Sequence, residues 1–105
     1  MNEAIWGIVG IAHRAGKITS GYTGSLKLVQ GGRGKLVLLA QDASDNTKKV
    51  FYDKGKYYGV PVYQVGSIAE MGNALGKGHR AVLVCSDAGF SKSMIKILEG
   101  NKDTM

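Results

Sequence analysis

Apolar residues recur along the chain with two alternating periods, which predict helices and strands in turn. Between residues 3 and 15 they stand three and four positions apart, and Gly16 follows where a helix would end. A short extended piece over 18–21 precedes a second helical pattern over 22–31 that two glycines terminate. Residues 35–41 form a continuous Leu/Val run, which is typical of a strand covered on both faces.

The second half of the chain repeats this alternation. Helical spacing extends to Tyr58, where Gly59 and Pro61 prevent continuation. Strands are expected over 60–65 and 81–85 because both segments are short and apolar. Three residues are candidate N-caps for the helix that ends at Tyr58, namely Asp42, Ser44 and Asp45.

A capping box marks the start of another helix. Ser67 and Glu70 stand three positions apart, so each side chain can accept a hydrogen bond from a backbone amide of the other residue. This helix should be short and end near Gly76. A last amphipathic helix is expected to end at Gly100, and residues 101–105 are expected to fray.

Alternation of helices and strands over 105 residues predicts a single α/β domain built as a three-layer α/β/α sandwich. A two-domain enzyme is excluded by length. Hydrophobic residues make up 44% and charged residues 21%, which is the composition of a chain that folds alone. In such sheets, ligand-binding loops usually follow the carboxyl ends of the strands.

The charge balance points to a polyanionic partner. Lysine and arginine number 14 against 8 aspartate and glutamate residues, which gives a net charge of +6 and favours nucleic acid. A single cysteine, Cys85, allows no internal disulfide, so a reducing cytoplasm is expected. No secretory leader pattern is present, and every apolar run is too short to cross a membrane.

Enzymatic and cofactor chemistry finds little support. The spacing from Gly10 to Lys17 is one residue too long for a phosphate-binding P-loop, and the glycines of 76–81 precede a strand instead of following one. His13 and His79 lack metal-ligand spacing, so no metal or other cofactor is predicted. Cys85 is interpreted as a core residue, and the aspartates near position 42 as helix caps and not as an acid–base pair.

The segment from Gly21 to Lys27 is the strongest candidate site. A glycine-rich turn that leads into a helix exposes backbone amides and the positive end of the helix, which suits a phosphodiester backbone. Thr23 and Ser25 would add hydroxyl donors, and Lys27 would add an ammonium group. An ordinary turn with a Ser or Thr cap is the alternative.

Other basic residues gather at two places. Arg33 and Lys35 precede the Leu/Val strand and would add charge to a nucleic-acid surface. In the helix that ends at Tyr58, the lysines are interpreted as a solvated face and the tyrosines mostly as core. The lysines are Lys48, Lys49, Lys54 and Lys56, and the aromatic residues are Phe51, Tyr52, Tyr57 and Tyr58.

Four segments together resemble the kink-turn RNA-binding ribosomal-protein family, whose members include ribosomal proteins L7Ae and L30e, and in particular its YlxQ-like bacterial branch. They are residues 8–17, residues 21–27, residues 35–47, and residues 71–77 with their sequel 84–90. The match runs in order over about residues 3–99. This resemblance implies a three-layer fold with a four-stranded mixed sheet, and RNA as the ligand.

The resemblance also implies where RNA would bind. Family members recognise the kink-turn, a bent internal loop with tandem sheared G·A pairs, through the signature G-x-N-E-x-x-K. Its glycine falls on Gly21 and its lysine on Lys27, whereas Thr23 and Gly24 replace the Asn and Glu. Because those two side chains contact base edges in the family, base recognition should be weaker here while the grip on phosphates remains.

A second contact is implied for the loop after the last strand, where Asp87 is expected to cap the following helix. The predicted RNA-binding residues are therefore Gly21, Tyr22, Thr23, Gly24, Ser25, Lys27, Arg33, Lys35, Ser86, Asp87, Ala88, Gly89 and Phe90. The expected protein is a monomeric, non-enzymatic binder of structured RNA, with the ribosome as one candidate setting. The alternative is a protein-interaction module that kept the fold and lost RNA recognition.

Overall fold

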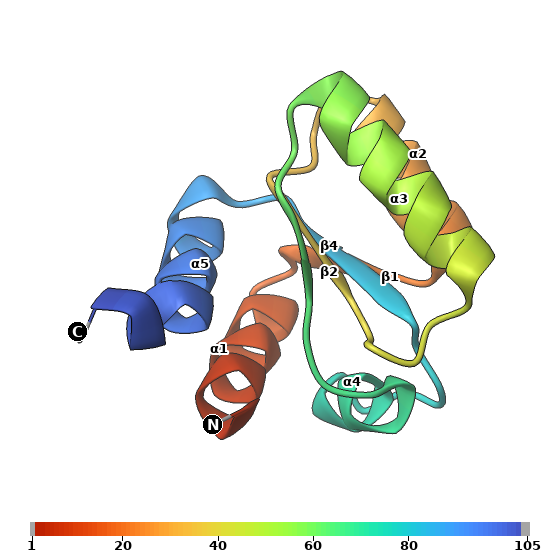
Figure 1. Ribbon diagram of the computed structural model, residues 1–105. Helices are drawn as coiled ribbons and strands as arrows, with labels where there is room; N and C mark the ends of the chain where they lie inside the picture. The colour runs from red at the N-terminus through yellow and green to blue at the C-terminus, as the bar shows by residue number, and fades with distance from the viewer. Residues whose placement is uncertain (1, 104–105) are drawn as a thin grey trace.

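Helices alternate with strands throughout residues 2–103, the range that the computed structural model describes (Figure 1). The alternation predicted from the sequence is therefore confirmed. The helices are α1 (Asn2–Arg14), α2 (Tyr22–Gln30), α3 (Asp45–Tyr58), α4 (Ile68–Ala74) and α5 (Ala88–Asp103). The strands are β1 (Ile18–Ser20), β2 (Leu36–Leu39), β3 (Val62–Gln64) and β4 (Val82–Cys85).

The four strands form one mixed sheet in the order β1-β4-β2-β3. β4 pairs antiparallel with both β1 and β2, and β3 pairs parallel with β2. Every residue of the two central strands is buried, as the Leu/Val run predicts. β1 and β3 are thus the two edges of the sheet.

Side chains of the central strands alternate between two hydrophobic clusters, one on each face of the sheet. Leu36 and Leu38 of β2 belong to the cluster that includes Met71 of α4 and Met94 of α5. Their neighbours Val37 and Leu39 belong to the other cluster, together with Val29 of α2 and Phe51 of α3. The remaining buried members of that cluster are Val60, Val82 and Val84. Figure 1 shows α2 and α3 on one face and α1, α4 and α5 on the other, which confirms the three-layer sandwich.

Asp42 caps a different helix from the one predicted. The N-cap of α3 is Ser44, whose Oγ accepts the amide of Thr47 at 3.1 Å. The carboxylate of Asp42 instead accepts the amide of Ile68, at the start of α4, at 2.8 Å. A cap across 26 positions of sequence depends on how β2 and α4 are brought together, which local spacing does not reveal.

The ends of the other helices follow local chemistry with one exception. Ser67 and Glu70 form the predicted capping box, and Gly59 ends α3 with a left-handed φ of 71°. Gly100 does not end α5: it lacks a positive φ, and the helix continues to Asp103. The predicted helix end at Gly100 is therefore wrong. The fraying expected over 101–105 stays a prediction, and residues 104–105 lie outside the described residues.

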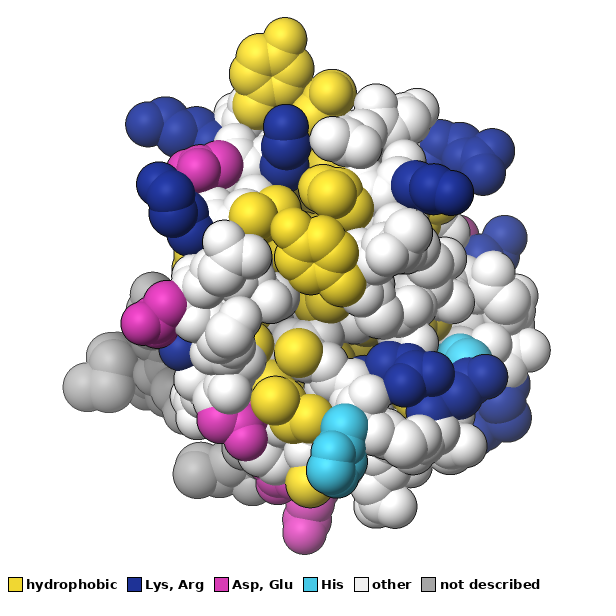
Figure 2. Space-filling view, turned by 90° about the vertical axis from the view of Figure 1, so that its right-hand side faces the viewer, with side chains coloured by type: hydrophobic (Ala, Val, Ile, Leu, Met, Phe, Trp, Pro, Cys, Tyr) yellow, Lys and Arg dark blue, Asp and Glu magenta, His cyan; other side chains and the backbone are white. Residues whose placement is uncertain are grey.

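The tyrosines of α3 were predicted mostly as core, but they lie at the surface. Tyr52 is 41% exposed, Tyr57 80% and Tyr58 39%. The buried stripe of α3 consists of Phe51 and Gly55 instead. A Cβ on Gly55 would come within 2.7 Å of the Val60 carbonyl oxygen, so the helix backbone itself packs against the β3 segment. Figure 2, which views the side of the molecule where α2 and α3 lie, shows hydrophobic side chains down the middle of that face.

Candidate nucleic-acid interface

The N-terminus of α2 is open to solvent and has no side-chain cap. Gly21 occupies the N-cap with φ 91° and ψ 158°, a backbone conformation that residues other than glycine rarely adopt. Its own amide donates to the Val82 carbonyl at 2.9 Å, and its carbonyl accepts the amide of Ser25 at 3.1 Å. The amides of the first helical residues, Tyr22 to Gly24, have no intrahelical acceptor, and the first turn holds no acidic residue. This terminus can therefore hold an anion.

Side chains around this terminus differ in what they offer. Thr23 is exposed, and Tyr22 is 40% exposed with its ring edge-on to Phe51 at 5.5 Å. Ser25 is fully buried, and its hydroxyl donates to the Thr19 carbonyl at 3.3 Å. The prediction that the Ser25 hydroxyl would face a ligand is wrong, because position 25 lies on the side of α2 that packs on β1.

Arg80 lies beside the α2 terminus, although it is not among the RNA-binding residues predicted from the sequence. Its Nε donates to the Ser20 hydroxyl at 3.1 Å, and its Nη1 donates to the His79 carbonyl at 2.9 Å. These bonds fix the guanidinium at the end of β1, one residue before Gly21. The remaining N–H groups of Arg80 point to no partner among residues 2–103 and are available to a phosphate.

Arg80 owes its position to an unusually close backbone contact. A Cβ on Gly72 of α4 would lie 1.8 Å from the carbonyl oxygen of Gly78, so only glycine permits this approach. The amide of Lys77 also donates to the Gly72 carbonyl at 2.9 Å. The turn that carries Lys77, His79 and Arg80 is thus packed against α4. The glycines of this turn indicated a close backbone contact, but the sequence did not show that α4 is the element contacted.

The loop after β4 does not flank the α2 terminus, contrary to the prediction. Because β1 and β4 are antiparallel, Ser20 pairs with Leu83, whereas the amide of Ser86 donates to the Lys17 carbonyl at 3.0 Å. The loop that contains Ser86, Asp87, Ala88, Gly89 and Phe90 therefore lies at the other end of β4, about 10 Å away along the strand. Sequence spacing alone could not fix this, since it does not give strand direction.

Within that distant loop, the two larger side chains already have partners. Asp87 accepts the amide of Phe90 at 2.8 Å, which confirms the predicted cap of α5. Phe90 packs against the core cluster beneath α5. Lys35 lies at the same end, because its amide donates to the Cys85 carbonyl at 2.8 Å. There it borders a hollow of about 280 Å³ whose other lining residues are Ala88, Ser91, Lys92 and Ile95.

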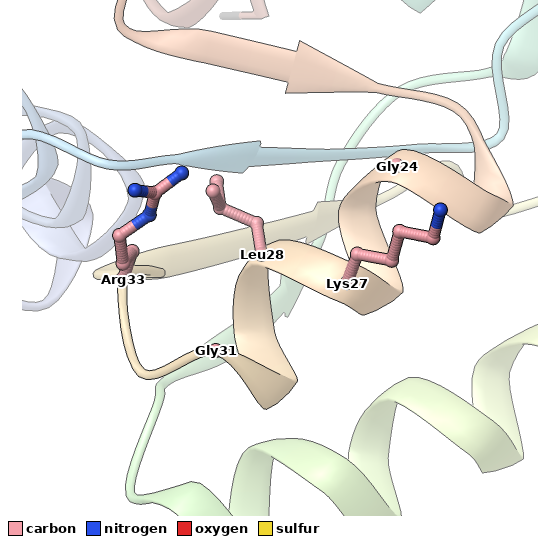
Figure 3. A pocket seen from close by; sticks show the side chains of 5 residues that line it. All are labelled: Gly24, Lys27, Leu28, Gly31 and Arg33. Atoms are coloured by element: carbon pink, nitrogen blue, oxygen red, sulfur yellow. The ribbon is translucent and has the colours of Figure 1, made fainter.

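A groove along α2 joins other predicted residues. It has a volume of about 480 Å³ and is lined by Gly24, Lys27, Leu28, Gly31 and Arg33. Figure 3 shows Leu28 between Lys27 and Arg33, which extend from opposite ends of the groove. The two glycines leave this side of the helix without bulky side chains, and none of the lining residues is acidic. The groove therefore offers a small apolar floor between two cations.

Other chemistry is sparse in the described part of the chain. Residues 2–103 contain no group of three or more His, Cys, Asp or Glu side chains that could hold a metal ion. Cys85 is buried in the core, as predicted. None of the helices described is both long and apolar enough to cross a membrane.

The architecture is that of a small α/β/α protein whose uncapped α2 terminus lies beside a guanidinium. Comparison with known proteins refines that class. The chain belongs to the Ribosomal protein L7Ae/L30e/S12e/Gadd45 family, whose model matches residues 3–95. The predicted resemblance is confirmed.

Individual relatives match over nearly the whole chain. The "RNA-binding protein YlxQ" of Bacillus subtilis is 42% identical over 92 residues, covering 88% of this chain and 92% of that protein. The "RNA-binding protein YlxQ" of Enterococcus faecium is 39% identical over 93 residues, covering 89% of each. A solved structure of a protein of unknown function from Bacillus halodurans is 37% identical, with a TM-score of 0.87, and covers 90% of this chain and 96% of that one.

Proposed function

We propose that this protein binds structured RNA through the surface formed by the first turn of α2, Lys27 and Arg80, with the α2 groove extending it to Arg33. The observation that carries the proposal is the uncapped α2 terminus beside a guanidinium whose position is fixed by Ser20. Amides and cations of this kind bind the phosphate backbone. Membership of a family whose bacterial relatives are named RNA-binding proteins supports the same ligand.

The preferred RNA is a bent internal loop of the kink-turn type. Such a bend brings two backbone segments close together, which suits a surface with anion-binding groups both on α2 and on the turn before β4 that carries Arg80. Base recognition is expected to be weak, because Gly24 has no side chain and Thr23 offers only a hydroxyl. Affinity would therefore come mainly from phosphates, and binding would fall steeply with salt.

A mobility-shift assay tests this proposal with two RNAs, a kink-turn and the same RNA without its G·A pairs. Selective retention of the kink-turn supports kink-turn recognition, and equal retention supports general binding of structured RNA. Lys27→Ala should weaken both complexes about equally, since a lysine contact to phosphate carries no sequence information. Affinity that stays unchanged between low and moderate salt would contradict a phosphate-based interface.

The second candidate function is a protein-interaction module, which the loss of acidic and amide side chains at positions 23 and 24 favours. Absence of binding to either RNA at low salt would support it. In both cases the proposed protein is a non-enzymatic monomer of the cytoplasm, where the lone thiol of Cys85 would stay reduced.

A further inference from the structure

An oriented aromatic ring lies on the outer side of α3, away from the interface described above. Tyr52 is 41% exposed, and its hydroxyl accepts a hydrogen bond from Nε2 of Gln64 at 3.0 Å. Gln64 belongs to β3, the edge strand opposite to β1. The ring is thus held at the surface by a defined contact while much of its area stays in water.

Lysines flank this ring along the helix. Lys48 and Lys56 stand four positions before and after Tyr52, which places them one helical turn away on the same side. Lys49 is also near, but it pairs with Asp53 at 3.8 Å. Among the described residues this is the only ion pair on α3, so Lys48 and Lys56 keep uncompensated charges.

Tyr57 does not belong to this side of the helix. It is 80% exposed, but it stands five positions after Tyr52 and therefore points about 140° away around the helix axis. Its ring meets the edge of Tyr58 at a centroid distance of 4.8 Å instead. We call the set of Lys48, Tyr52 and Lys56 the tyrosine–lysine surface.

This surface is separate from the α2 terminus. α3 meets α2 through Phe51, whose ring contacts Tyr22, whereas Tyr52 turns toward β3. The two surfaces therefore lie on different sides of α3. A single RNA could contact both only if a strand continued around the helix.

We propose that the tyrosine–lysine surface binds single-stranded RNA that flanks the structured element held at α2. A base would stack on the ring of Tyr52, and the ammonium groups of Lys48 and Lys56 would hold the phosphates on either side of it. Exposed aromatic rings among cations are the usual platform for single-stranded nucleic acid. A protein partner fits less well, because lysine is depleted in the centres of protein interfaces. This inference rests on the proposed function in one respect only: the structured RNA element bound at α2 is what holds the single strand close to this surface.

The test compares the kink-turn RNA with and without a single-stranded uridine extension of about eight nucleotides, a length within the range of single-strand binding sites. For the wild type, the extension should raise affinity at least about fivefold, as expected for one stacked base. Tyr52→Ala should abolish this gain, and Tyr52→Phe, which keeps the ring, should retain most of it. Lys27→Ala should weaken both RNAs and leave the gain intact.

Two results would overturn the inference: no gain for the wild type, or an equal gain for Tyr52→Ala. If the kink-turn RNA does not bind at all, the proposed function fails, but the uridine oligonucleotide alone still tests this surface. Its binding to the wild type and its loss in Tyr52→Ala would support the surface, and no binding would refute it. If Tyr52→Ala abolished the binding of an acidic peptide but changed no RNA affinity, the surface would be assigned to a protein partner instead.

Discussion

Replacing Arg80 by alanine should weaken RNA binding more than any change at the opposite end of β4. Nε and Nη1 of Arg80 already donate to Ser20 and to the His79 carbonyl, so the guanidinium is fixed before RNA arrives. A hydrogen bond to a charged group contributes about 1.5–3 kcal/mol, which corresponds to about a 10- to 100-fold loss of affinity. Removing one phosphate contact should also reduce the slope of log affinity against log salt by about 0.7 to 0.9.

Fluorescence anisotropy with a labelled RNA over a salt series measures both quantities. Arg80→Lys keeps the charge but loses the fork of donors, so it should recover the salt slope and only part of the affinity. Lys92→Ala is the matched control, because Lys92 lines the hollow near Lys35 at the far end of β4. The placement of the interface is refuted if Arg80→Ala binds like the wild type, or if Lys92→Ala loses as much affinity.

Three further predictions concern stability and selectivity. Gly72→Ala should lower the free energy of unfolding in urea by about 3 kcal/mol or more, since its Cβ would lie 1.8 Å from the Gly78 oxygen. Gly7→Ala is the control and should not destabilise the fold, because there is open space around Gly7. The double variant Thr23→Asn/Gly24→Glu should raise the preference for a kink-turn over its G·A-less version about tenfold in competition assays, and the new Cβ at position 24 requires only a small shift of the Thr19 methyl group at 3.1 Å; an unchanged ratio would show that these positions do not face bases. The hydrogen bond and the negative charge of Glu99 raise the pKa of Tyr63 above its ordinary value of 10.0, so this pair stabilises the fold at lower pH and the contribution is lost as pH rises through the raised pKa. Tyr63→Phe should therefore be less stable than the wild type at neutral pH, and the difference should shrink above about pH 10.

Local signals predicted the elements and the glycine-led turn into α2 well. Gly59 and the Ser67–Glu70 pair act on backbone groups a few positions away, so their effect follows from sequence spacing. Gly21 is similar, because its φ of 91° is required where β1 turns into α2. The fold class could be predicted for the same reason: hydrophobic period and helix caps are properties of short segments.

Apart from the end of α5, the errors involve contacts between distant segments. Arg80 reaches the α2 terminus only because β4 runs antiparallel to β1, and the same pairing carries the loop at Ser86 to the other end. The tyrosines of α3 are exposed because Gly55 lets the helix backbone approach β3 closely, so the narrow buried stripe needs no large ring there. Strand direction and such close approaches are decided by the packing of the whole domain.

The bond from the Gly21 amide to the Val82 carbonyl joins the first third of the polypeptide to its last quarter. A nascent chain or proteolytic fragment that stops before residue 80 lacks both Arg80 and β4, so its β1 is unpaired and it cannot present the complete surface. Under the proposed function, RNA is captured only once the final strand has docked. Bound RNA would in turn protect that strand against local opening, because it binds only the closed form.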